Sequence, residues 1–300
     1  MATPNPDMFT LPFQLTKSMR RDVYPAVDPA SPDLKVTGKV ILITGAAGGL
    51  GSAVAKAWAG AEAKGIVLVG RDAKKLEAFG STLSAPYLVA AGSITNEADV
   101  QSIFAKAIEK FGSVDVVVNA AGGMAPNALI GDMEPAVWWE DFEVHVKGNY
   151  NLVHHFIKAT GAKGTFINLV SLAATLLIPG SSAYGCAKIA AIKFGQNVDL
   201  EYPNIRYFSV HPGIVEASSD GRGAVIDAFT PFAKDKQALT AGLTLYLQKE
   251  EANLFRGGFI SSNWDVEEMQ KHKDEIVEGN LLKLAFIGGK LGPEGHAWNA

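Results

Sequence analysis

The sequence predicts a single-domain α/β fold with a doubly wound parallel sheet. Short apolar runs alternate with helix-periodic segments through the middle of the chain, and no Pro/Ser-rich linker separates two halves. Strands are expected near residues 39–44, 65–70, 87–91, 114–119, 164–170, 205–210 and 258–261. Helices are expected near residues 49–63, 73–83, 96–111, 135–160, 182–201 and 233–248. In such a sheet the carboxyl ends of the strands meet at one rim, where ligands bind.

The first strand leads directly into a glycine-rich turn and then into a helix. Glycines allow a backbone to approach a pyrophosphate, and the helix N-terminus offers free N–H groups and positive potential. The next strand follows at the distance that completes a βαβ unit. A tight turn without a ligand is the simpler alternative. The residues predicted to bind a dinucleotide here are Gly45, Gly49, Leu50 and Gly51.

Tyr184 and Lys188 form the most informative pair of side chains. They are four residues apart in a helix-periodic segment, a spacing that places a phenol and an ammonium on one helix face. An isolated Tyr has a pKa of about 10, and a cation one turn away favours the phenolate and lowers that pKa. Ser171, after the apolar run 164–170, is placed to reach the same substrate oxygen. Because the spacing is also common on solvated helices, the prediction of proton transfer depends on the other motifs.

Together these motifs resemble the short-chain dehydrogenase/reductase family of the single-domain type. The match includes Thr44-Gly45-x-x-x-Gly49-x-Gly51, Asn119-Ala120-Ala121-Gly122, the residues Ser171, Tyr184 and Lys188, and Pro212-Gly213-Ile214-Val215. The resemblance implies a Rossmann-like dinucleotide-binding catalytic domain over residues 38–265, with extensions at 1–37 and 266–300. The N-terminal extension and the segment 257–265 are similar to a fungal branch of the family.

The resemblance implies hydride transfer between a nicotinamide and a ketone or secondary alcohol. Tyr184 would be the general acid/base, Lys188 would lower its pKa and bind the ribose, and Ser171 would orient the carbonyl. The polar, glycine-rich segment 216–231 would be the mobile substrate lid. Tyr184 and Lys188 would also contact the cofactor, as would Asn119, Gly122, Pro212, Gly213 and Val215.

Arg71 favours NADP(H) as the cofactor. The position at the end of the second strand, where a carboxylate would select NAD(H), is Gly70, and the guanidinium of Arg71 follows it. A surface ion pair of Arg71 with Asp72 or Glu77 is the alternative. Ser93 stands where the family usually has an Asp, and it is expected to hold the adenine more weakly.

His145 departs from the family pattern, which has an Asn that holds a water for proton relay. An imidazole can hold that water or titrate near neutral pH, and Asn149 one turn later is a second candidate. Alternatively, His145 only fills the position, and catalysis proceeds with Ser171, Tyr184 and Lys188. Its presence also leaves open a tailoring enzyme that performs isomerisation, cyclisation or dehydration. A non-catalytic nucleotide-binding protein is disfavoured by the intact Ser, Tyr and Lys.

Composition limits the remaining partners and locations. The formal charge is −4 with mixed signs, which gives no basic stripe for nucleic acid. One cysteine, the absence of a signal-like start and the absence of a membrane-length apolar run predict a cytoplasmic protein. The pair His154-His155 has no third ligand at metal spacing, so no metal is expected. A small-molecule substrate and a homodimer or homotetramer through the helices at 135–160 and 182–201 are expected from the family.

Overall fold

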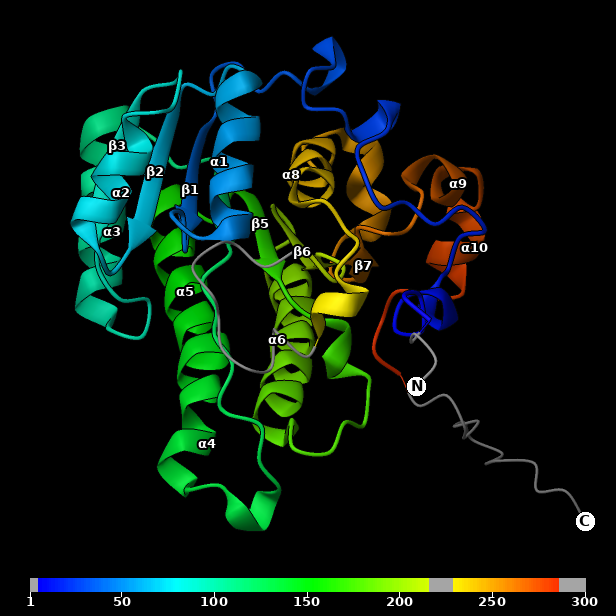
Figure 1. The fold of residues 1–300 in the computed structure, drawn as a ribbon. Helices are drawn as coiled ribbons and strands as arrows, with labels where there is room; N and C mark the ends of the chain where they lie inside the picture. Colours follow the sequence, from blue (N-terminus) through cyan, green and yellow to red (C-terminus); the bar gives the residue numbers. More distant parts are fainter. Residues whose placement is uncertain (1–4, 216–228, 286–300) are drawn as a thin grey trace, which may run out of the picture.

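The computed structural model describes residues 5–215 and 229–285, which form one parallel sheet covered by helices on both faces (Figure 1). The strand order is β3-β2-β1-β4-β5-β6-β7. The strands are β1 Val40–Thr44, β2 Gly65–Gly70, β3 Tyr87–Ala91, β4 Val116–Asn119, β5 Gly164–Leu169, β6 Ile205–His211 and β7 Phe259–Ser261. All six pairings are parallel, which confirms the predicted Rossmann-like sheet.

Alternating side chains of the strands enter two separate cores. In β1, Ile41 and Ile43 pack on one face of the sheet, and Val40 and Leu42 pack on the other. Because neighbouring side chains of a strand point to opposite faces, the uninterrupted apolar run of β1 makes both faces of the sheet apolar. Polar groups that could bind a ligand are therefore found at the carboxyl ends of the strands and not on the two faces of the sheet.

Helices connect the strands, and two more follow the last strand. They are α1 Gly49–Gly60, α2 Ala73–Gly80, α3 Glu97–Phe111, α4 Pro135–Phe142, α5 Gly148–Thr160, α6 Ser182–Glu201, α8 Gln237–Tyr246, α9 Val266–Lys271 and α10 Lys273–Glu278. On one face α1 meets α8, where the Trp58 indole donates to Thr244 Oγ1 at 3.0 Å. Helices α3, α5 and α6 cover the other face. No helix in the described ranges is long and apolar enough to cross a membrane.

Two predicted helices differ from the structure in informative ways. The segment expected as one helix over 135–160 contains a π-helical turn at Glu143–Lys147, in which the Gly148 N–H bonds to the Glu143 carbonyl. Such turns are frequent at functional sites, and this one includes His145. The helix expected from 233 begins only at Gln237, because the backbone before it pairs elsewhere: the Asp235 N–H donates to Ile214.

Candidate active site

A cleft of about 550 Å³ lies at the carboxyl ends of β1, β2, β3 and β4. This is the position where the strand order reverses between β1 and β4, the usual ligand site of a doubly wound sheet. The predicted cofactor residues that line it are Gly45, Arg71, Ser93 and Gly122. The cleft therefore brings together residues that follow four different strands.

The glycine turn after β1 is shaped by close backbone contacts. Gly45 has φ +62°, and a Cβ there would lie 2.8 Å from the Ala120 carbonyl oxygen. A Cβ on Gly51 would lie 2.2 Å from the Gly45 oxygen, so only glycine allows α1 to start this close to the turn. No side chain caps the N-terminus of α1. Gly49, Leu50 and Gly51 form its first turn but do not line the cleft, and their contact with a cofactor stays a prediction.

A buried polar network holds the loop after β4. Thr44 Oγ1 donates to Asn119 Oδ1 at 2.6 Å and accepts from the Ala121 N–H at 3.0 Å. The Asn119 amide in turn donates to Asn168 Oδ1 at 3.0 Å. Asn119 is buried and does not line the cleft, so its side chain fixes the loop that carries Gly122.

Asn149 belongs to the same interior network. Its amide donates to the Tyr207 hydroxyl at 3.0 Å, and the residue is fully buried. The idea that Asn149 holds a relay water beside Tyr184 is therefore wrong, because its side chain is committed to the core.

Ser171, Tyr184 and Lys188 come together beside this cleft. Ser171 follows β5, accepts from the Ala173 N–H at 3.1 Å and shares a hydrogen bond with Tyr184. Lys188 Nζ lies 5.4 Å from the centre of the Tyr184 ring and donates to the Leu169 carbonyl at 2.9 Å. The four-residue spacing on α6 thus places phenol and ammonium on one face, as predicted.

Burial dominates the electrostatics of this group. Burial raises the pKa of the Tyr184 hydroxyl to about 12, although the Ser171 hydrogen bond opposes the shift. Burial likewise lowers the pKa of Lys188 to about 7, and the Asp141 carboxylate opposes that shift. The expected lowering of the Tyr184 pKa by Lys188 is therefore wrong for this structure, because burial raises that pKa and Ser171, not Lys188, is the group that opposes the shift. The Tyr184 hydroxyl is therefore protonated at pH 7.

His145 lies in the π turn, with its ring edge-on to Tyr184 at 5.3 Å between ring centres. Its Nε2 is 2.9 Å from the Gly123 carbonyl oxygen. Since a carbonyl only accepts, Nε2 carries the proton and Nδ1 is an acceptor. Burial and, second, Lys188 lower the pKa of this ring to about 3. The expectation that His145 titrates near neutral pH is therefore wrong, and the ring stays neutral.

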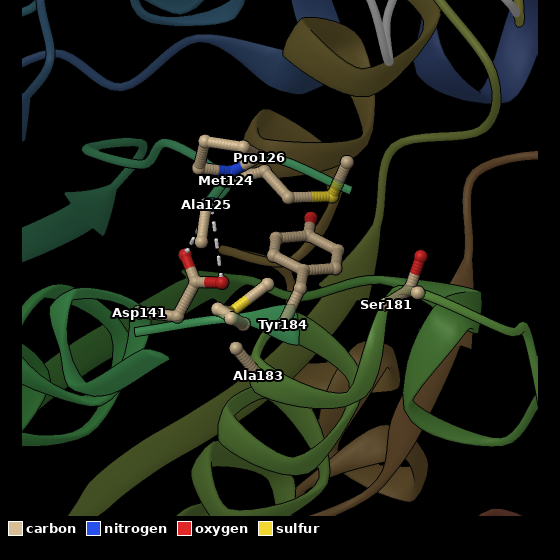
Figure 2. Close-up of a pocket in the computed structure, with 9 residues that line it drawn as sticks. Met124, Ala125, Pro126, Asp141, Ser181, Ala183 and Tyr184 are labelled. Carbon is tan, nitrogen blue, oxygen red and sulfur yellow. Dashed lines mark hydrogen bonds between the residues drawn. The ribbon is translucent and has the colours of Figure 1, made fainter. Parts of the chain in front are cut away.

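Asp141 is a site residue that the sequence analysis missed. Its two oxygens both accept from the Ala125 N–H at 3.2 Å, and it lines a small pocket together with Met124 and Tyr184 (Figure 2). Burial raises the pKa of this carboxyl. Its position four residues before His145 was the available signal, since that spacing puts both on one helix face.

The segment after β6 is held by the Asp235 carboxylate. Asp235 Oδ2 accepts from the Ile214 N–H at 2.6 Å, and Gly213 has φ +81° against the same carboxylate. The Pro212 carbonyl accepts from Thr240 Oγ1 at 3.0 Å. Pro212, Gly213 and Val215 do not line the cleft, and their contact with the nicotinamide stays a prediction. Most of the predicted lid, residues 216–228, lies outside the described residues.

Arg71 lines the cleft without the ion pair considered as its alternative. The Asp72 carboxylate caps α2 by accepting from Lys74 and Lys75 N–H groups, and Glu77 accepts from the Tyr87 hydroxyl. Within residues 5–215 and 229–285, Arg71 is exposed and pairs with neither carboxylate. Arg71 thus lies on the wall of the cleft.

The sequence spacing missed a third group beside the two adjacent histidines. Glu97, at the start of α3, brings its carboxylate to 3.6 Å from His155 Nε2, and the ligand atoms of Glu97, His154 and His155 lie within 4.8 Å of one another. Contrary to the expectation from sequence, the two histidines therefore have a third metal-type ligand beside them. At 1.5 Å per residue along the helix, this cluster is roughly 15 Å from His145 and takes no part in the chemistry at Tyr184.

Comparison with known proteins agrees with this geometry. The family model for short chain dehydrogenase matches residues 39–223. The chain is 32% identical over 291 residues to the short chain dehydrogenase pigC of Monascus ruber, covering 92% of this chain and 94% of that protein. It is 28% identical over 293 residues to the short chain dehydrogenase mpl6 of Monascus purpureus, covering 92% and 97%. A short-chain type dehydrogenase/reductase from Mycobacterium ulcerans superposes with a TM-score of 0.69 at 22% identity, covering 76% and 89%.

The chain belongs to the short-chain dehydrogenase family. Members of this family are oxidoreductases that use NAD or NADP, act on small molecules and are typically oligomeric. The fungal relatives cover 92% of the chain, whereas the bacterial structure covers about three quarters of it.

Proposed function

We propose that the protein is an NADP(H)-dependent oxidoreductase that interconverts a ketone and a secondary alcohol. The observation that carries the proposal is the group formed by Ser171, Tyr184 and Lys188 beside the 550 Å³ cleft. The cleft fits a dinucleotide, since its glycine turn excludes a Cβ and leaves the N-terminus of α1 uncapped. Arg71 on its wall supports the 2′-phosphorylated form.

The cofactor, when bound, supplies hydride to the carbonyl carbon in reduction and accepts it in the reverse reaction. Ser171 orients the substrate oxygen by hydrogen bonding. Tyr184, neutral because burial raises its pKa to about 12, donates the proton that the oxygen needs. Lys188 lies one turn away and stabilises the phenolate that remains. The neutral His145 offers Nδ1 as an acceptor for a water that returns a proton from solvent.

The direct test is consumption of NADPH followed at 340 nm with a panel of ketones. Reduction of at least one ketone, faster with NADPH than with NADH, is the expected result. Binding of NADPH without reduction of any ketone would favour the tailoring alternative, in which isomerisation, cyclisation or dehydration uses proton transfer alone. One contact supports that alternative: the Asp141 carboxylate is 3.9 Å from His145 Nε2, which adds a second acid/base group near Tyr184. The Ser, Tyr and Lys group speaks against a non-catalytic role.

The pH dependence of the reduction rate distinguishes titration of Lys188 from titration of His145. Because the pKa of His145 is about 3 and that of Lys188 about 7, a change between pH 6 and 8 belongs to Lys188. Reduction is expected to slow as pH rises through this range, since Lys188 loses the proton that supports Tyr184. His145→Asn should keep both rate and profile, whereas His145→Leu should slow turnover about tenfold because it cannot hold water. The pH profile of kcat/KM for the cofactor measures this, because it reports the pKa values of groups in the free enzyme. Loss of the rate change between pH 6 and 8 in His145→Asn would contradict its assignment to Lys188.

We also propose that two copies pair through α5 and α6. Tyr150 on α5 is 52% exposed and Ile189 on α6 is 41% exposed, which leaves apolar surface on both helices. A homodimer or homotetramer would cover it.

A further inference from the structure

The N-terminal segment, residues 5–37, packs against the C-terminal part of the fold. It runs beside α8, α9 and α10, dark blue against orange and red in Figure 1. The Trp264 indole donates to the Phe13 carbonyl at 3.0 Å, and the Val266 N–H donates to the Tyr24 hydroxyl at 2.9 Å. The family match begins at residue 39, so these contacts come from outside the matched part.

Arg21 of this segment pairs with a carboxylate in the interior. Its Nη1 is 2.7 Å from Asp235 Oδ1, and Asp235 is fully buried. The other end of the guanidinium bonds to Asp7, and the Arg21 carbonyl accepts from the Lys236 N–H at 2.8 Å. Both the side chain and the backbone of Arg21 thus fix the position of Asp235.

The same carboxylate shapes the segment after β6. Its Oδ2 accepts from the Ile214 N–H at 2.6 Å, and a Cβ on Gly213 would lie 2.4 Å from that oxygen. The Asp235 N–H donates back to the Ile214 carbonyl at 3.1 Å. Asn263 Nδ2 donates to Oδ1 at 2.8 Å, so Arg21 supplies the only cation among the donors that the described residues give this carboxylate.

Removal of the Arg21 guanidinium would change the protonation of the Asp235 carboxyl group. Burial raises the pKa of Asp235, and Arg21 is the first influence that opposes the shift. Without Arg21, the carboxyl takes up a proton more readily and becomes a weaker acceptor for the Ile214 N–H. The segment from Gly213 to Val215 then loses the contact that sets its path.

We propose that Arg21 is a positioning residue for the nicotinamide end of the cofactor, acting through Asp235 on the segment Pro212–Val215. The inference rests on the proposed function and on the predicted contact of that segment with the nicotinamide. The N-terminal segment then acts on the cofactor site indirectly, through Asp235.

Arg20 provides a matched control on the adjacent position. It also pairs with a buried carboxylate, Asp265, at 2.5 Å, but Asp265 caps α9, and among the described residues no hydrogen bond joins it to residues 212–215. Dissociation constants are measured by fluorescence titration for NADPH and for 2′,5′-ADP, which lacks the nicotinamide. Arg21→Gln should weaken NADPH roughly tenfold and leave 2′,5′-ADP unchanged, since only the nicotinamide end is displaced. Arg20→Gln should change neither, and Arg21→Lys should restore most of the NADPH affinity.

If Arg21→Gln weakens the binding of NADPH and of 2′,5′-ADP equally, the substitution has loosened the whole cofactor site and the proposal is overturned. The proposal is also overturned if Arg21→Gln and Arg20→Gln change the NADPH dissociation constant equally. Hydrogen exchange of a peptide covering 212–215 gives a readout without cofactor. Exchange there should be faster in Arg21→Gln than in Arg20→Gln, and equal rates would overturn the proposal. If the parent binds neither NADPH nor NADH, the proposed function fails, while the exchange comparison still decides whether Arg21 positions the segment.

Discussion

Replacement of Tyr184 by Phe is expected to lower turnover by about two to four orders of magnitude, the usual contribution of a general acid/base. The change removes only the hydroxyl that donates the proton, so the dissociation constant of the cofactor should stay near that of the parent. Initial rates at 340 nm and a cofactor titration measure the two effects separately.

Tyr202→Phe is the matched control, because Tyr202 stands at the C-terminal end of the same helix, far from the cleft. Its turnover should equal that of the parent. Near-parental turnover in Tyr184→Phe would rule out the proton-transfer mechanism, even if NADPH still binds.

Arg71→Asp is expected to weaken NADPH about 100-fold, equivalent to about 3 kcal/mol, because repulsion of the 2′-phosphate replaces attraction. NADH lacks that phosphate and should bind nearly as well as before. Lys74→Asp makes the same charge change on an exposed residue that does not line the cleft, and it should spare both cofactors. Equal losses of NADPH and NADH in Arg71→Asp would mean that Arg71 does not recognise the phosphate.

Local patterns were sufficient for the fold and for much of the site. The short apolar run of β1 predicted a strand, and the glycines after it predicted the turn at the cleft. The spacing of Tyr184 and Lys188 predicted their shared face on α6. Each of these depends on residues within one or two turns of the chain, where periodicity is decisive. The domain boundaries at 37/38 and 265/266 stay predictions.

Contacts between distant residues could not be read from the sequence. Arg21 and Asp235 are 214 residues apart, and the sequence around each of them does not indicate that the two pair. Glu97 likewise reaches the histidines of α5 only through tertiary packing. The direction of the Tyr184 pKa was missed for a related reason: spacing indicates a nearby cation, but desolvation depends on everything that surrounds the ring.

The network of Thr44, Asn119 and Asn168 ties the ends of three adjacent strands by directional bonds. The loop from Ala120 to Gly123 is thereby fixed when the chain folds, before any ligand arrives. Ordering a loop on binding would subtract from affinity, and here that conformational entropy has already been lost in folding. The protein therefore meets its cofactor with one wall of the cleft already in place, and the free energy of their contact is available for affinity.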